Sequence, residues 1–99
     1  LDLAGRDHLR HLVAPVQGRW LPYGGYYERV RWSPDGRRIW TERKAQGERF
    51  RHDIWIPTDE DVRRLLDLAG MDVAAAWGGL DARPWDPRAE RWIYRALRR

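Results

Sequence analysis

Side chains that can act as nucleophiles are almost absent from this 99-residue chain. It has no cysteine and a single serine, Ser33, which lies in a predicted turn. Thiol catalysis and a serine triad are therefore excluded, because each needs its nucleophile beside a general base. No complete catalytic set is visible, so we assign no catalytic residue.

Histidines and carboxylates occur together at two places, and both have structural explanations. Asp7, His8 and His11 have a spacing compatible with metal ligation, but the sequence offers no convincing further ligand, so we expect no metal site. His52 and Asp53 are neighbours on a predicted strand. Their side chains then point to opposite faces and cannot act as a dyad, and we expect His52 in the core.

Composition limits the partners. The chain has 19 basic and 15 acidic residues, a net charge of +4 and signs that are interleaved along the sequence. A nucleic-acid footprint should gather basic residues on one face, so we expect no nucleic-acid partner. No apolar run approaches the length of a membrane span and no signal-peptide pattern is present, so we expect no membrane contact. Without cysteine, a reducing compartment is acceptable, and we expect a cytoplasmic protein.

The second part of the chain, 58–99, predicts a helix followed by two strands. Thr58 is placed to cap a helix that begins with three acidic residues, and Gly70 is placed to end it. An apolar stripe at helical spacing should face a sheet; it consists of Val62, Leu65, Leu66 and Ala69. Alternating residues then predict strands over 71–77 and 91–97, and the last strand is apolar on both faces, as in a sheet covered on both sides.

The first part predicts a short helix over 6–14, an aromatic loop over 17–25 and three antiparallel strands over 26–32, 38–44 and 48–56. The turn between the first two strands contains Pro34 and Gly36 at favoured positions. Alternation gives this meander one apolar face and one face of charges with tryptophans. Trp55 on the mixed face is expected either to line a substrate pocket or to pack against a helix.

The loop between the last two strands carries a family resemblance. A helix ending in Ala-Gly, a strand, and a loop of the type G-x-x-D-x-x-P-aromatic-D-P before an arginine resemble the C-terminal end of class I S-adenosylmethionine-dependent methyltransferases. The family often has glycine where Ala82 stands and serine where Glu90 stands. The matching positions are Gly78, Asp81, Pro84, Trp85, Asp86, Pro87 and Arg91, and the opening segment LDLAGRDHLR resembles the one that leaves the family's fifth strand.

The resemblance implies an α/β Rossmann-like parent enzyme, of which this chain, α+β by itself, is one unit over 1–99. Residues 15–57 would be an antiparallel lid insertion and 58–99 the helix with the closing strand pair. The implied function is methyl transfer to a small-molecule acceptor. The cofactor, S-adenosylmethionine, would be bound mainly by an N-terminal half of the same enzyme, because the chain has no G-x-G-x-G turn and no acidic end of a second strand. A homodimer through the lid is also implied.

We expect the acceptor pocket to be lined by Arg6, Tyr26, Trp40, Trp55 and Trp85. Aromatic faces of this kind can attract a cationic acceptor. Asp81 and Arg91 are expected to pair and hold the loop between the strands. The alternative interpretation is a small aromatic-rich module that binds a protein or peptide without catalysis, since the meander superficially resembles a WW domain.

The closing strand gives the resemblance a structural consequence. Strand 91–97 should pair with 71–77 on one side and with the short segment 1–3, or a strand from outside this chain, on the other. One face of that strand should then be left open by this chain's own residues.

Overall fold

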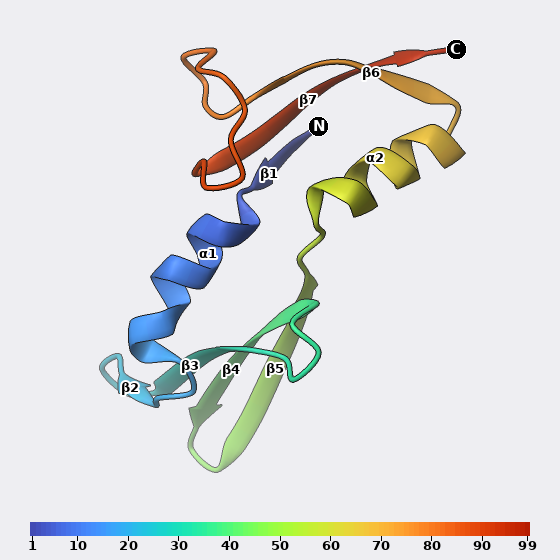
Figure 1. The fold of residues 1–99 in the computed structure, drawn as a ribbon. Helices are drawn as coiled ribbons and strands as arrows, with labels where there is room; N and C mark the ends of the chain where they lie inside the picture. The colour runs from blue at the N-terminus through green and yellow to red at the C-terminus, as the bar shows by residue number, and fades with distance from the viewer. The chain divides into compact units, whose positions relative to one another are not determined.

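A computed structural model describes all 99 residues and divides them into two compact units. The first unit consists of Leu1–His11 and Pro57–Arg99, and the second of Leu12–Ile56. Together they contain two helices and two antiparallel sheets, which confirms the α+β class expected for the chain (Figure 1). Neither helix is both long and apolar enough to cross a membrane.

The sheet of the first unit has the order β1-β7-β6, with β1 at Asp2–Ala4, β6 at Met71–Trp77 and β7 at Arg91–Arg98. Both pairings are antiparallel, and the register sets Leu3 opposite Trp92 and Trp77 opposite Ile93. The predicted placement of the closing strand between its two neighbours is therefore confirmed.

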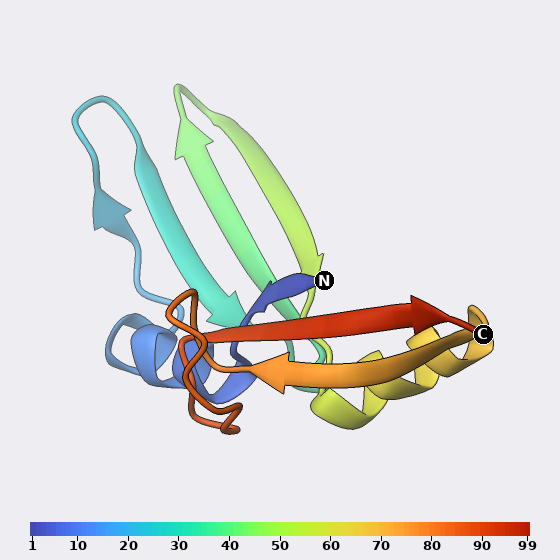
Figure 2. The ribbon, with the colours of Figure 1, turned by 90° about the horizontal axis from the view of Figure 1, so that it is seen from above.

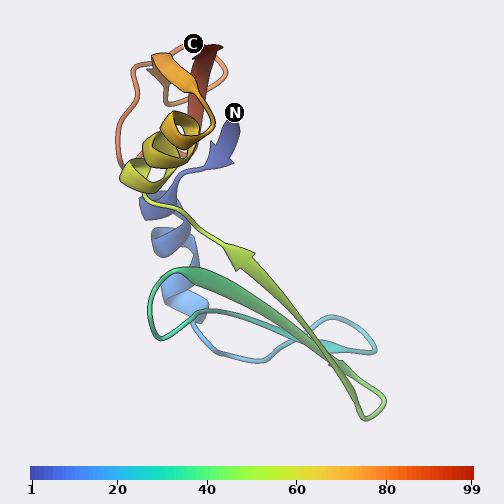
Figure 3. The ribbon, with the colours of Figure 1, turned by 90° about the vertical axis from the view of Figure 1, so that its right-hand side faces the viewer.

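Helix α2, at Asp59–Leu68, covers one face of this sheet and contributes Val62 to the core between them (Figures 2 and 3). Thr58 forms a capping box with Asp61, and Gly70 has a φ of 78° at the end of the helix, both as expected from the sequence. The buried cluster contains Val62, Trp92 and Tyr94, each at most 3% exposed.

The predicted helix face is wrong in part. Val62 and Leu66 pack against the core cluster, whereas Leu65 is 50% exposed and Ala69 is also exposed. The apolar face predicted for the helix is wider than its contact with the sheet, because only part of that face reaches β6 and β7. The opposite face of β7, which was expected to be open, carries Leu97, 49% exposed, and Ile93, which is half-buried, so the face is open only in part.

Gly5 joins β1 to α1, the helix at Arg6–Val13, and only glycine fits there. A Cβ atom at this position would lie 1.8 Å from the carbonyl oxygen of Ala89. The Gly5 N–H donates a hydrogen bond to the carbonyl of Glu90 at 2.9 Å. The backbone before β7 therefore lies directly against the start of the helix.

The second unit is a four-stranded antiparallel sheet of order β2-β3-β4-β5, entered through the 3-10 turn η1 at Ala14–Val16. Its strands are β2 at Leu21–Pro22, β3 at Tyr27–Trp32, β4 at Arg38–Ala45 and β5 at Glu48–Trp55. The last three match the predicted meander. Strand β2 falls in the segment predicted as a loop, because its two residues are too short to show an alternating pattern.

Candidate functional site

One face of the second unit gathers most of its positive charge. Because cross-strand partners point to the same side, the register assigns this side to the odd positions of β3 and β5 and the even positions of β4. We call it the basic-aromatic face. Its members are Trp20, Tyr27, Arg29, Arg31, Arg38, Trp40, Glu42, Lys44, Arg49, Arg51, Asp53 and Trp55. Six of these carry a positive charge and two a negative one.

Glu42 offsets part of the positive charge in the middle of the face. Its carboxylate accepts two hydrogen bonds of 3.0 Å from Arg29 and one of 2.8 Å from Arg31. The hydrogen bond from Arg29 is the largest influence that lowers the pKa of Glu42, and Arg31 lowers it further although burial opposes both. Arg51 similarly pairs with Asp53 at 3.3 Å. Each of these three arginines therefore already has a carboxylate partner.

Two of the three tryptophan rings on this face, Trp20 and Trp40, are covered by cations, whereas Trp55 is 41% exposed. Trp40 has the guanidinium groups of Arg31 and Arg51 at 4.9 and 4.7 Å from its ring centre. Trp20 has Arg29 at 4.5 Å and Lys44 at 4.3 Å. The protein's own cations occupy the positions that a cationic ligand would take on these two rings. The two rings therefore offer little binding energy to a cationic acceptor.

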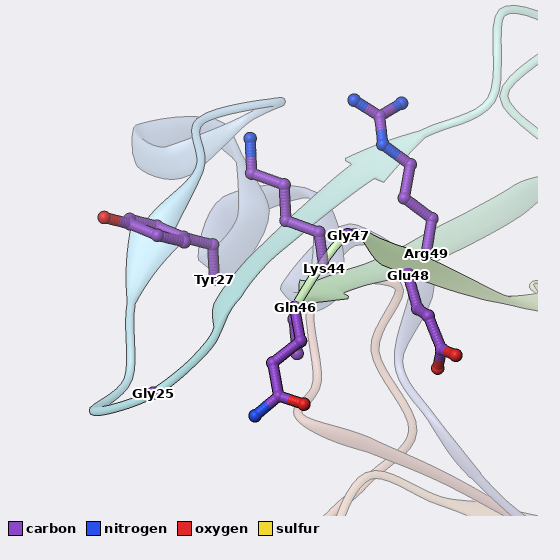
Figure 4. Close-up of a pocket in the computed structure, with 8 residues that line it drawn as sticks. Gly25, Tyr27, Lys44, Gln46, Gly47, Glu48 and Arg49 are labelled. Carbon is purple, nitrogen blue, oxygen red and sulfur yellow. The ribbon is translucent and has the colours of Figure 1, made fainter.

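The hairpin end of the face is different, because its two cations have no carboxylate within ion-pair distance. Lys44 lies directly opposite Arg49 across the strand pair, and Tyr27 lies on the other side of Lys44. Gln46 and Gly47 both have positive φ, as in the tight turns that fix such a register. The three side chains border a hollow of about 300 Å³ that Gln46 and Glu48 also line. In Figure 4, Lys44 and Arg49 rise on one side of the hairpin and Gln46 and Glu48 extend to the other.

The five residues expected to line an acceptor pocket do not all meet. Trp40 and Trp55 share the basic-aromatic face, and Trp55 is 41% exposed. Tyr26 lies just before β3, where its ring contacts Arg43 at 4.4 Å. Arg6 is the first residue of α1, and the ring centre of Trp85 lies 5.5 Å from that of Trp92. Both Arg6 and Trp85 belong to the first unit. Lys44 and Arg49 were missed, although the alternation of the meander strands already places them on the mixed face.

Two further expectations about charged residues are wrong. His52 is exposed, because β5 is an edge strand whose residues are all exposed. Arg91 pairs with Asp2 on β1 rather than with Asp81, and Asp81 instead pairs with Arg83 at 2.9 Å. The hydrogen bond from Arg91 is the main cause that lowers the pKa of Asp2.

The resemblance assigns the S-adenosylmethionine site mainly to residues outside this chain. Class I methyltransferases are expected to bind it where a strand runs through a glycine-rich turn into a helix. The strand-to-helix turn at Gly5 is filled instead by the backbone of Ala89, and its N–H is bonded to Glu90. All strand pairings are antiparallel.

Comparison with known proteins gives a likeness of fold. No family model and no curated protein matches the sequence. Among solved structures, the chain is similar to the CcbJ methyltransferase from Streptomyces caelestis, with a TM-score of 0.63 and 8% identity. The match covers 98% of this chain and 44% of that one, so the chain spans less than half the length of the methyltransferase. The chain thus has a fold related to part of a methyltransferase.

Proposed function

We propose that this chain is the C-terminal part of an S-adenosylmethionine-dependent methyltransferase that acts on a small-molecule acceptor. The observation that carries the proposal is the likeness to part of a methyltransferase over 98% of the chain. The order β1-β7-β6 supports it, since the resemblance in the loop before Arg91 implies the same arrangement of closing strands.

In this proposal the four-stranded sheet supplies the lid and one wall of the acceptor pocket. The transferable methyl group would come from a cofactor bound mainly outside this chain. Methyl transfer needs alignment of the acceptor and exclusion of water more than it needs acids or bases. That requirement agrees with the lack of a complete catalytic set and with a face rich in aromatic side chains.

The test compares two proteins by calorimetry with S-adenosylmethionine. The product of the complete reading frame that encodes this chain is expected to bind the cofactor with micromolar affinity, whereas residues 1–99 alone are expected not to bind appreciably. Micromolar binding by the 99-residue chain would contradict the assignment of the cofactor site to another part. A complete protein that binds no cofactor would refute the methyltransferase proposal itself.

A further inference from the structure

We infer that the hairpin end of the basic-aromatic face binds the anionic group of a small planar molecule, a ring that carries a carboxylate or a phosphate. The site consists of Lys44, Arg49 and Tyr27, with Trp20 behind the two cations. If this molecule is the methyl acceptor, that role rests on the proposed function. The existence of the anion-binding site does not.

The first argument is the distribution of ion pairs. Arg29 and Arg31 share the carboxylate of Glu42, and Arg51 pairs with Asp53. Lys44 and Arg49 have no carboxylate within ion-pair distance, although both stand on the same face. The hairpin end therefore holds two adjacent cations without an ion pair, whereas Arg38, which also has no carboxylate within ion-pair distance, stands alone at the other end of the face.

The second argument is the pairing of like charges. Lys44 and Arg49 are direct cross-strand partners, and like charges in that position destabilise a sheet. Both lie near one ring, with Lys44 Nζ 4.3 Å and the Arg49 guanidinium carbon 5.8 Å from the centre of Trp20. An anion between them would remove the repulsion and accept charge-assisted hydrogen bonds from both.

The third argument concerns shape and available rings. The hollow of about 300 Å³ has the size of a small aromatic acid. The ring of Tyr27 at its edge is 49% exposed, with Lys44 Nζ 5.6 Å from its centre. Trp20 and Trp40 are covered by the chain's own cations, which leaves Trp55, at the other end of the face, as the one tryptophan there on which a single-stranded nucleic acid could stack a base. A small ring with one anionic group fits these features better than a polymer does.

Lys44 is the only lysine of the chain and provides a direct probe. In protein labelled only at lysine, the side-chain NMR signals of Lys44 should shift saturably with phenylphosphate or benzoate, and the stronger of the two identifies the anionic group. Arg49→Gln should weaken this binding roughly tenfold or more, the effect of losing one charge-assisted hydrogen bond. The control is Arg43→Gln, which removes the same charge one residue from Lys44 on the opposite face and should change the affinity less than about twofold.

Several results would overturn the inference. They are the absence of a saturable shift with either anion, equal weakening by the two variants, or stronger binding of phenyltrimethylammonium than of the anions. Tight binding of a thymidine oligonucleotide that phenylphosphate does not displace would assign the face to nucleic acid instead. Since no cofactor is used, a failure of methyl transfer in the complete protein leaves this result unaffected. If the Lys44 signals do not shift with either anion while the complete protein transfers methyl groups, the anion site is refuted and the proposed function is not.

Discussion

Replacing Ala82 by glycine should stabilise the chain, although glycine normally destabilises. Ala82 has a φ of 61°, a left-handed conformation in which a Cβ atom collides with the following carbonyl oxygen. The conformation is held by the loop, in which the Ala82 N–H donates to Gly79 at 3.2 Å and the Gly78 N–H donates to Arg83 at 2.9 Å. This is the position at which the methyltransferase family often has glycine.

The magnitude follows from two opposing effects. The left-handed conformation costs a residue with a Cβ atom about 1–2 kcal/mol. Glycine also has more conformational freedom in the unfolded chain, and this freedom offsets about 0.5–1 kcal/mol of the stabilisation gained by removing the Cβ atom. Ala82 is exposed, so its methyl group contributes little packing. We therefore expect Ala82→Gly to raise the free energy of unfolding by roughly 0.5–1 kcal/mol.

The assay is urea unfolding followed through the amide NMR signals of β7, which belong to the same unit as Ala82. Ala69→Gly is the control, because Ala69 is also exposed but has an ordinary φ of −81°, and it should lose about 0.5–1 kcal/mol. Gly70→Ala, at a φ of 78°, should lose about 1 kcal/mol or more. If Ala82→Gly destabilises as much as Ala69→Gly does, the loop does not impose the left-handed conformation and the reasoning fails.

Three other measurements examine the first unit. In urea melts, Val62→Ala should cost about 1.5–3 kcal/mol because the side chain is 2% exposed, and Leu65→Ala at most about 1; equal costs would contradict the helix face described above. Gly5→Ala should destabilise by about 1–3 kcal/mol or more, since the new methyl group meets a carbonyl oxygen, and a neutral effect would disprove the close approach. Tyr94, 2% exposed and bonded to Asp59 at 2.7 Å, has a raised pKa, caused first by burial and then by that carboxylate. Its contribution to stability is complete below the unfolded pKa near 10 and is lost as pH rises from there toward the raised folded pKa. Above about pH 10 the wild type should therefore lose stability more steeply than Tyr94→Phe does.

The fold was predictable where local chemistry and tertiary packing agree. Thr58 and Gly70 delimit α2 because capping is decided within a few residues, and the turns at Gly36 and Gly47 delimit the meander for the same reason. The face of α2 was only half predictable. A helix sequence shows which residues are apolar, but the sheet beneath decides how many of them it covers, and Leu65 falls outside that contact.

The partners of charged side chains were less predictable, because they depend on register. Asp81 and Arg91 flank one loop in the sequence, yet β1 lies beside β7 and brings Asp2 closer to Arg91. His52 was expected in the core because it alternates with apolar residues. That pattern fixes a face of β5, whereas the edge position of the strand leaves the face exposed.

The same dependence on register explains how a chain with interleaved charges acquires a basic face. In a strand, successive side chains point to opposite sides, so opposite charges that alternate in the sequence separate in space. The pairs Glu28 with Arg29 and Glu48 with Arg49 look neutral along the chain. In the sheet their arginines join the basic-aromatic face, while Glu28 pairs with Arg43 on the other side. A modest net charge of +4 therefore does not limit the charge of one face, and a shift of one residue in the β4–β5 register would place Lys44 and Arg49 on opposite sides. The turn that fixes this register is thus part of the proposed anion site.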